Sequence, residues 1–318
     1  MDINKEILKL DWDREPQGLY QPIAYTLVAG GKRVRPQLAM IASQLFGGKE
    51  EDVRNAALAL EVFHNFTLVH DDLMDRAKVR RARPTVHVQW NENTAILAGD
   101  QMMIEAYKLI TEVPEDKLPK VLRLFNKMAT QICEGQQYDV DFENKEEVSI
   151  DDYLKMIRLK TSVLLATALQ IGAYIAGAEQ QQQEALYQFG INVGLAFQIQ
   201  DDILDVWGEP DTFGKAVGGD ISCNKKTFVY LEAMRILGEK HEEEKRALQA
   251  WYSQVLDDNT EKIAAVKALF EQFNVRSACE TVVENYTQKA LQILNGLPQN
   301  AAIEQLSQLA NKLNTRKD

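Results

Sequence analysis

Apolar side chains recur every three to four residues over much of the chain, without the strict alternation that marks a strand. This spacing places the apolar residues on one face of an α-helix. It predicts five long helices, over 52–76, 94–111, 118–142, 150–175 and 179–207. No proline lies between Pro119 and Pro210, so nothing in that stretch obliges a helix to break. The pattern predicts an all-α fold.

Capping residues agree with these boundaries. Ser149, followed three residues later by Asp152, resembles a capping box, and Gly177 can end that helix in the left-handed conformation. Gly208, Glu209 and Pro210 stop the next helix. The predicted loops are 30–36, 76–91 and 208–224. Amphipathic helices then continue to about Leu313, with breaks near Gly238, 257–259, Asn274 and 296–298.

The composition is that of a globular protein. Of the 318 residues, 45% are hydrophobic and 26% are charged, and an all-α enzyme of this length can form around one continuous core. We expect a single domain over residues 1–318. The net charge of -11 gives no long-range attraction to nucleic acid or to anionic lipid. Any phosphate binding must therefore come from local clusters of cations.

The chain shows no sign of export or of membrane insertion. Cys133, Cys223 and Cys279 are odd in number and lack metal or redox spacing, which fits a reducing cytosol. The first residues contain no signal peptide or transit character. The longest uncharged run, 161–178, is long enough to approach a membrane span, but its polar residues favour a buried helix. The expected location is cytoplasmic.

Two Asp-Asp-x-x-Asp clusters lie inside apolar helical segments. The first contains Asp71, Asp72 and Asp75, and the second contains Asp201, Asp202 and Asp205. Random placement predicts on the order of 0.1 such motifs in a chain of this kind. Residues four apart share a helix face, so each cluster presents a pair of carboxylates about one turn apart. One cluster alone would be an ordinary solvated acidic patch, but two within apolar surroundings call for a bound cation.

Oxygen ligands without a Cys or His cluster favour a hard ion, and one or two carboxylates completed by substrate phosphates are typical of Mg²⁺. The acidic run 257–261 is different, because it lies at a predicted helix start in polar surroundings and is interpreted as a cap.

Basic residues gather beside the acidic clusters, against the acidic trend of the chain. Lys32, Arg33 and Arg35 follow a pair of glycines. Five cations follow the first Asp cluster: Arg76, Lys78, Arg80, Arg81 and Arg83. Lys215, Lys225 and Lys226 follow the second. Arg and Lys hold phosphate groups, so the pattern predicts diphosphates held between Mg²⁺ and these cations. A nucleic-acid patch is disfavoured because stacking aromatics are not interleaved.

Several strings resemble, in order and spacing, the trans-isoprenyl diphosphate synthase family. They are GGKRVRP at 30–36, HNFTLVHDDLMD at 64–75, RRARPT at 80–85, GQQYD at 135–139, KT at 160–161, FQIQDDILD at 197–205, FGK at 213–215 and GGD at 218–220. The resemblance implies an isoprenoid synthase-type bundle of ten or more mostly antiparallel helices around a deep central cavity. It also implies a homodimer, and Mg²⁺-dependent head-to-tail condensation of isopentenyl diphosphate with dimethylallyl, geranyl or farnesyl diphosphate.

The resemblance assigns roles by position. Three Mg²⁺ ions would bridge the allylic diphosphate to two facing Asp motifs. Their ligands would be Asp71, Asp75 and Asp201, supported by Asp72, Asp205 and Asp139. The allylic diphosphate would be clamped by Arg80, Lys160 and Lys215. Isopentenyl diphosphate would bind Lys32, Arg33, His64 and Arg81. The reacting carbons and leaving group would be lined by Thr161, Phe197 and Gln198.

Taken alone, several of these residues have ordinary interpretations. His64 would be an interior histidine, and Thr161, Phe197 and Gln198 would be unremarked helix residues. One position departs from the family pattern, because Ala82 stands where members usually carry glycine after the paired arginines. Alanine excludes a positive φ but leaves both guanidinium groups in place, so this departure is expected to matter little.

Product length in the family depends on the helix just before the first Asp motif. Phe66 and the small Thr67 occupy this position, and Phe66 lies five residues before Asp71. An aromatic residue there resembles short-chain synthases that stop at geranylgeranyl diphosphate, with farnesyl diphosphate as the alternative. Phe66 can equally be core packing alone.

Two further functions deserve comparison with chain elongation. A terpene cyclase shares the fold, but its second metal motif usually combines Asn or Asp, Ser or Thr, and Glu, whereas this chain repeats Asp-Asp-x-x-Asp. A non-catalytic helical subunit would have no reason to keep both Asp clusters. Elongation is the favoured function.

Overall fold

The computed structural model of the protein describes residues 2–208 and 217–314. Over these residues the regular structure is almost entirely helical, and the strands form one two-stranded antiparallel hairpin. The all-α prediction is confirmed. Within the described ranges, no helix combines the length and the hydropathy needed to cross a bilayer.

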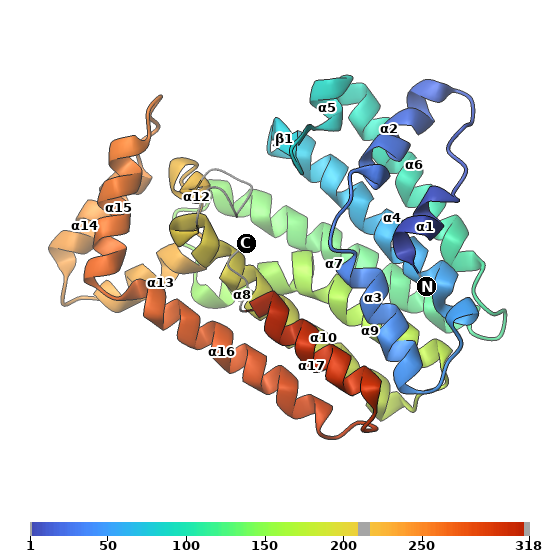
Figure 1. Cartoon of the computed structure of the whole chain (residues 1–318). Helices are drawn as coiled ribbons and strands as arrows, with labels where there is room; N and C mark the ends of the chain where they lie inside the picture. Colours follow the sequence, from blue (N-terminus) through green and yellow to red (C-terminus); the bar gives the residue numbers. More distant parts are fainter. Residues whose placement is uncertain (1, 209–216, 315–318) are drawn as a thin grey trace. The chain divides into compact units, whose positions relative to one another are not determined.

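The elements follow one another along the chain as shown in Figure 1. In order they are α1 (Ile3–Leu8), α2 (Gln17–Val28), α3 (Val34–Leu45), α4 (Glu50–Met74), β1 (Val79–Arg80), β2 (Arg83–Pro84), α5 (Val86–Gln89), α6 (Glu92–Thr111), α7 (Leu118–Asn144), α8 (Ile150–Ile157), the π-helical turn η1 (Arg158–Ser162), α9 (Val163–Ile175), α10 (Gln180–Trp207), α12 (Gly219–Ser222), α13 (Phe228–Leu237), α14 (Glu242–Tyr252), α15 (Thr260–Gln272), α16 (Val275–Leu294) and α17 (Ala301–Asn314).

The chain divides into two compact units. The first contains residues 1–128, 164–187 and 297–306, and the second contains residues 129–163, 188–296 and 307–318. The first Asp motif belongs to the first unit and the second motif to the second. Because the segments of the two units alternate along the sequence, no single linear boundary separates them. The single domain expected from the sequence stays a prediction.

The predicted helix boundaries agree closely with the structure. The five long helices correspond to α4, α6, α7, the run from α8 to α9, and α10. Ser149 and Asp152 form the predicted capping box. Gly177 has a φ of 84°, as expected for the residue that ends α9. In the acidic run 257–261, the predicted helix start is confirmed, because α15 begins at Thr260. The residue at the cap is Asn259, which makes no capping hydrogen bond with its side chain, whereas Asp258 before it accepts from the Thr260 N–H at 2.9 Å.

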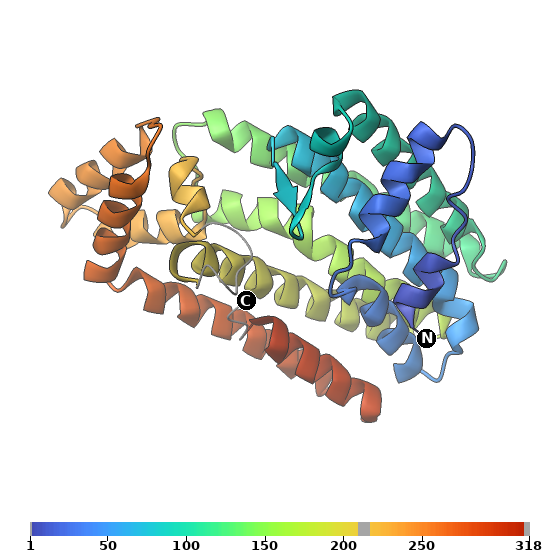
Figure 2. The same cartoon turned by 45° about the horizontal axis from the view of Figure 1, so that its top comes forward.

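Three local features differ from the prediction. The loop expected over 30–36 is shorter, because α3 begins at Val34. The loop expected over 76–91 contains the hairpin β1–β2 and the short helix α5, and Figure 2 shows the hairpin as two small arrows. The helix expected over 150–175 contains the π-helical turn η1. The predicted loop 208–224 falls partly outside the described residues, and α12 lies within its described part.

Close packing of α4 against α6 positions the first Asp motif. The two helices lie side by side in both views (Figures 1 and 2). Gly99 of α6 permits this approach, because a Cβ atom there would lie 2.2 Å from Nε2 of His70 on α4. His70 Nε2 is also 3.1 Å from the backbone oxygen of Ile96 on α6. The helix that ends in the first motif is therefore held by its neighbour one residue before Asp71.

Candidate active site

The first Asp motif occupies the last turn of α4. The backbone N–H of Asp75, the C-terminal cap, donates to the carbonyl oxygen of Asp71 at 2.8 Å. This i,i+4 relationship places both residues on the same helix face, as the sequence predicted. Asp71 is half-buried and Asp75 is exposed. The pair therefore presents carboxylate oxygens toward solvent at the end of the helix.

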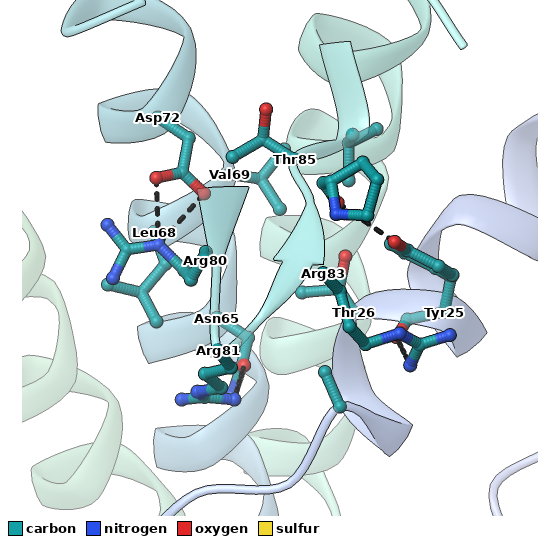
Figure 3. Close-up of a pocket in the computed structure, with 13 residues that line it drawn as sticks. Tyr25, Thr26, Asn65, Leu68, Val69, Asp72, Arg80, Arg81, Arg83 and Thr85 are labelled. Atoms are coloured by element: carbon teal, nitrogen blue, oxygen red, sulfur yellow. Dashed lines mark hydrogen bonds and ion pairs between the residues drawn. The ribbon is translucent and has the colours of Figure 1, made fainter. Parts of the chain in front are cut away.

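Asp72 faces a different direction and has a different partner. It is buried, and both of its carboxylate oxygens accept from Nε of Arg80 at 2.8 Å (Figure 3). Burial raises the pKa of Asp72, and the charge of Arg80 opposes this effect. Because Arg80 occupies strand β1, the ion pair fixes the hairpin to α4. Asp72 thus supports the site by holding a basic residue in place.

The turn of the hairpin places Arg81 and Ala82 in the left-handed region, with φ of 51° and 57°. Two consecutive positive φ angles are the signature of the tight hairpin turn that favours glycine or asparagine. The reasoning that alanine excludes a positive φ is contradicted at Ala82, which adopts one, whereas the expectation that this departure matters little stays a prediction. A left-handed conformation costs a non-glycine residue about 1–2 kcal/mol.

Arg81 leaves this turn toward the loop before α3. Its Nη1 donates to the carbonyl oxygen of Gly30 and lies 3.5 Å from Oδ1 of Asn65 (Figure 3). The guanidinium packs on Gly31, where a Cβ atom would lie 2.9 Å from Nη2. Gly31 thus makes room for Arg81, and Gly30 supplies the carbonyl oxygen that its guanidinium binds. Lys32 itself is exposed.

Arg33 lies in the interior, where its guanidinium is fully engaged by protein groups. Only 5% of the residue is exposed. Nη1 donates to Oε1 of Glu61 at 2.6 Å, Nη2 to the carbonyl oxygen of Leu27 at 2.5 Å, and Nε to Oδ1 of Asn4 at 3.1 Å. The residue also has a φ of 47°, immediately before α3. The structure therefore does not give Arg33 the open guanidinium expected of a substrate ligand.

Arg35 and His64 form part of one electropositive cluster. Burial lowers the pKa of Arg35 to about 10, with Glu61 opposing this shift and Arg81 adding to it. Burial lowers the pKa of His64 well below its usual value, and the nearby arginines lower it further, Arg35 most. Arg35 was among the cations predicted from the sequence to hold diphosphates, but isopentenyl diphosphate was assigned to Arg33 and His64 and not to Arg35. The sequence signal that could have included Arg35 was its position in the same GGKRVRP string as Lys32 and Arg33.

Phe66 and Thr67 lie on α4 between His64 and the first Asp motif. Phe66 packs edge to face against Phe63 and His70, with ring centroids 5.2 and 5.0 Å away. Phe63 in turn packs against Phe125 of α7 at 5.2 Å. The Thr67 hydroxyl donates to the carbonyl oxygen of His64 at 2.8 Å. Phe66 is therefore a half-buried member of a row of aromatic rings, between Phe63 and His70.

The second Asp motif lies near the end of α10. Asp201 is half-buried, whereas Asp202 is buried and accepts hydrogen bonds from three elements. The donors are the Tyr153 hydroxyl at 2.6 Å, the Phe228 N–H at 3.1 Å and Nε2 of Gln198 at 3.4 Å. Burial raises the pKa of Asp202 to about 8, and Asp220 contributes to this shift. Asp202 joins α8, α10 and the start of α13, a role that the sequence did not reveal.

Asp205 is tied to the chain just before and within α12. Its carbonyl oxygen accepts from the Gly218 N–H at 2.6 Å, and its Oδ2 accepts from the Asp220 N–H at 3.0 Å. Gly218 has a φ of 83°, as a tight return of the backbone requires. The backbone at 218–220 therefore contacts the second motif at Asp205. The predicted phosphate ligand Lys215 lies outside the described residues.

The turn η1 carries the remaining predicted ligands of the second unit. Lys160 Nζ donates to Oδ2 of Asp139 on α7 at 2.6 Å, and both side chains are about one quarter exposed. The Thr161 hydroxyl donates to Oε1 of Gln198 at 3.2 Å. π-helical turns inside α-helices occur frequently at functional sites. Phe197, the neighbour of Gln198, is half-buried on α10.

Two glycines allow the neighbouring helices to approach η1. A Cβ atom on Gly135 of α7 would lie 2.3 Å from the Lys160 backbone nitrogen. A Cβ atom on Gly194 of α10 would lie 2.6 Å from Cα of Ser162. Gly135 stands four residues before Asp139, on the same face of α7. Gly135, which permits the contact, and Asp139, which binds Lys160, thus lie on the same face of α7.

The donor atoms at the two motifs suit a hard cation. Among the described residues, no group of three or more His, Cys, Asp or Glu side chains could hold a metal by itself. Asp71 and Asp75 supply two carboxylates, and Mg²⁺ commonly takes one or two carboxylates, with water and substrate phosphate completing its shell. Asp72 and Asp205 already accept hydrogen bonds from Arg80 and Asp220. The arrangement fits Mg²⁺ that binds together with a diphosphate.

Comparisons with known proteins agree with this chemistry. A geranylgeranyl diphosphate synthase of Methanosarcina mazei is 41% identical over 220 residues, which cover 69% of this chain and 68% of the relative. A crystal structure of a geranylgeranyl pyrophosphate synthase superimposes with a TM-score of 0.92 and 44% identity, covering 99% of this chain and 96% of the other.

A more distant relative has been solved with ligands. The polyprenyl synthase of Caulobacter crescentus CB15, complexed with calcium and isoprenyl diphosphate, has a TM-score of 0.86 and 28% identity, with 99% of this chain and 93% of the other covered. The sequence model of the polyprenyl synthetase family matches residues 16–272. The chain therefore belongs to the polyprenyl synthetase family and is a prenyltransferase.

Proposed function

We propose that the protein joins isopentenyl diphosphate head to tail to allylic diphosphates and releases geranylgeranyl diphosphate as its main product. The observation that carries this proposal is the pairing of acidic and basic groups in each compact unit. The first unit combines the Asp71–Asp75 face with Arg80, Arg81, Arg35 and His64. The second combines the second Asp motif with Lys160 and Asp139. In each unit, carboxylates that can bind a metal ion lie beside basic residues that can bind phosphate. This combination suits a diphosphate substrate that enters together with a metal ion.

The allylic diphosphate is bound by Arg80, Lys160 and Lys215 in this proposal. Arg80 is preorganised by Asp72, and Lys160 by Asp139, so both cations are oriented before substrate arrives. The family is generally Mg²⁺-dependent, and Mg²⁺ stabilises the negative charge of the departing diphosphate. We propose three ions, held by Asp71, Asp75 and Asp201. Thr161, Phe197 and Gln198 line the allylic carbons, and exclusion of water protects the developing carbocation.

Isopentenyl diphosphate is bound by Lys32, Arg35, His64 and Arg81. Arg35 replaces Arg33 in this set, because Arg33 is held in the interior by Glu61, Leu27 and Asn4. Arg35 instead lies in the cluster with His64 and Arg81, where burial and the charge of Arg81 disfavour its cation and Glu61 offsets part of that cost. A diphosphate relieves this repulsion. The isopentenyl double bond then attacks the allylic cation, and the released diphosphate accepts the proton.

The proposed product length follows from the aromatic residue on the helix just before the first Asp motif, as in short-chain synthases. Phe66 is backed by Phe63 and Phe125, so its ring has a rigid support against a lengthening hydrocarbon. The geranylgeranyl diphosphate synthase of Methanosarcina mazei supports the same product length. We further propose that the enzyme acts as a cytosolic homodimer. Support for the dimer comes from the family resemblance.

One assay tests the proposal. Purified protein receives isopentenyl diphosphate, each of the three allylic primers in turn, and Mg²⁺, and the products are identified by chromatography after phosphatase treatment. Geranylgeraniol is the expected alcohol. Farnesol would correct the product length, a cyclic hydrocarbon would indicate a terpene cyclase, and no product would contradict catalysis altogether.

Two variants serve as controls for the metal ligands. Asp71→Ala and Asp201→Ala should each lower turnover by at least about a hundredfold, the usual scale for losing one preorganised electrostatic group. Removal of Mg²⁺ by EDTA should abolish turnover of the wild-type protein. Near-normal turnover in either variant would contradict the assignment of three ions.

A further inference from the structure

Lys262 of α15 is a buried cation that the proposed chemistry does not use. The residue is fully buried, with 0% of its surface exposed. Its Nζ donates to Oδ1 of Asn224 at 2.5 Å and to the carbonyl oxygen of Gln254 at 3.1 Å. In the part of the chain that the structure describes, no carboxylate forms an ion pair with it. Burial accordingly lowers the pKa of Lys262.

A buried ammonium group without a counter-ion is expensive, because removing an ion from water costs several kcal/mol. An apolar side chain of similar length would fill the same space without that cost. The lysine adds hydrogen bonds to two acceptors from separate segments. One is the loop before α15 and the other is the segment after α12. Joining these segments is therefore the distinctive contribution of Lys262.

The segment that Lys262 holds, residues 217–227, also contacts α15 at its other end. Ile263, the next residue of α15, lies against Gly218, where a Cβ atom would be 2.9 Å from Cγ2 of Ile263. Asn224 has a φ of 58° and donates from Nδ2 to the carbonyl oxygen of Gln254 at 3.0 Å. Helix α15, which pairs with α14 in Figure 1, thus contacts the segment on both sides of α12.

The same segment fixes Asp205 of the second Asp motif. Gly218 N–H donates to the Asp205 carbonyl oxygen at 2.6 Å, and Asp220 N–H donates to Oδ2 of Asp205 at 3.0 Å. A continuous series of contacts therefore runs from Lys262 through Asn224 and α12 to the carboxylate of Asp205. All of its members belong to the second compact unit.

We propose that Lys262 is a positioning residue of the active site, which clamps residues 217–227 to α15 and thereby orients the second Asp motif for its metal ion. The inference rests on the proposed function, because it assigns Asp201 and its neighbours to Mg²⁺ binding. It gives the last hundred residues, which contain no recognised motif, a direct task in the reaction.

The first test replaces the ammonium group by an apolar side chain of similar length. Lys262→Met should speed amide hydrogen exchange at Gly218 and Asp220 by about tenfold or more, because their protection depends on the local stability of this segment. It should also raise the Mg²⁺ concentration for half-maximal turnover about 10- to 100-fold, the usual range when a group that supports a metal ligand is lost. The KM for isopentenyl diphosphate should stay unchanged. Lys267→Met on the same helix is the matched control and should alter none of these values.

A second pair of variants isolates the hydrogen bond in case Lys262→Met fails to fold. Asn224→Gly retains the positive φ but removes the acceptor, and should reproduce both effects. Asn224→Asp retains an acceptor for Lys262 and tolerates the same backbone conformation, so it should rescue both exchange and Mg²⁺ dependence.

The exchange measurement needs no turnover, so it tests the clamp even if the proposed reaction is wrong. Slow exchange in both Lys262→Met and Asn224→Gly would overturn the inference. Fast exchange with an unchanged Mg²⁺ dependence would also overturn it, because Lys262 would then stabilise the segment without serving the metal site.

Discussion

At the scale of single residues, two arginines separated by one position have opposite environments. Arg33 is buried and its charge is neutralised by Glu61 at 2.6 Å, with both side chains less than 5% exposed. Arg35 has a pKa lowered to about 10 by burial, with Glu61 opposing this shift and Arg81 adding to it. The Nε of Arg35 has no hydrogen-bond partner among the described residues. These environments support the proposal that the first arginine serves the fold and that the second uses its donor capacity to bind a diphosphate.

This difference predicts separable effects of substitution. Arg35→Gln should raise the KM for isopentenyl diphosphate about tenfold or more, since a hydrogen bond to a charged group contributes about 1.5–3 kcal/mol. Its melting temperature should change little, because the loss of attraction to Glu61 is offset by relief of the burial cost and of the repulsion from Arg81. Arg33→Gln should lower the free energy of unfolding by about 3–5 kcal/mol, as expected when a buried ion pair is broken.

Steady-state kinetics and chemical denaturation of both variants check this prediction. Arg54→Gln provides the control, because Arg54 is an exposed residue of α4 whose 3.8 Å ion pair with Glu6 should contribute little. If Arg33→Gln were stable and specifically impaired in isopentenyl diphosphate binding, the original assignment from sequence would be correct instead.

At the scale of elements, the turn η1 shows how a local irregularity positions chemistry. The extra residue of a π-helical turn rotates the side chains that follow, and here Lys160 and Thr161 lie within it. Gly135 and Gly194 leave space for the backbone of η1 on two neighbouring helices. The position of Lys160 therefore depends on residues that have no functional group.

Gly135→Ala tests this dependence. The new Cβ would lie 2.3 Å from a backbone nitrogen, which cannot move aside as a flexible side chain could. We expect a loss of about 1–3 kcal/mol in the free energy of unfolding, the usual effect of overpacking. Turnover should fall along with it as Lys160 shifts.

The control is Gly18→Ala in α2, where a Cβ atom would meet nothing within 4 Å. Alanine there should stabilise the protein by about 0.5–1 kcal/mol, because glycine is unfavourable inside a helix. The denaturation midpoints of the two variants should therefore shift in opposite directions, and turnover should fall only in Gly135→Ala. Equal stability of Gly135→Ala and wild type would mean that α7 and η1 are not packed as described.

The hairpin β1–β2 provides a second element-scale prediction. Ala82→Gly should relieve about 1–2 kcal/mol of left-handed strain, and the greater freedom of glycine in the unfolded chain should offset about 0.4–1 kcal/mol of that gain. We expect a small net increase in the free energy of unfolding. Ala29→Gly, at a φ of -63°, lacks the strain and should destabilise the protein. Thermal denaturation of both variants decides whether the turn is strained.

The elements differ in how far the sequence could predict them. Long periodic segments such as α4 and α10 were predicted to within two residues, because many apolar positions define each period. The hairpin was missed because its strands contain two residues each, too few for an alternating pattern. The π-helical turn was missed because no residue type encodes it. It arises from packing against Gly135 and Gly194, which are far away in sequence.

At the scale of the whole molecule, the sequence predicted the residues that carry the chemistry better than the residues that hold them in place. Both Asp motifs were evident because identical spacing recurred within apolar helices. The burial of Arg33 and the three-way binding of Asp202 were not evident, because Glu61, Tyr153 and Phe228 are brought close by folding alone. Sequence spacing reveals residues that act together on one helix face. It does not reveal which charges will be neutralised by the protein itself.

Product length is a property of the complete enzyme that one residue can test. Phe66 lies five residues before Asp71, about 7.5 Å along the helix at the standard rise. Its ring packs against the rings of Phe63 and His70, and Phe63 in turn packs against Phe125. A hydrocarbon that grows along α4 away from the Asp motif would meet this ring. Replacing the Phe66 ring by a smaller side chain should therefore allow further additions of isopentenyl diphosphate.

Phe66→Ala should shift the released products toward chains longer than geranylgeranyl while the enzyme stays active. The loss of stability should be smaller than the 3–5 kcal/mol typical of a fully buried phenylalanine, because Phe66 is half-buried. Phe46→Ala, at the half-buried C-terminal cap of α3, removes the same ring elsewhere and should leave product length unchanged. Chromatography of the dephosphorylated products from both variants decides the matter. An unchanged length distribution from active Phe66→Ala would reduce Phe66 to core packing, and the residue that ends elongation would then have to lie elsewhere along the path of the growing chain.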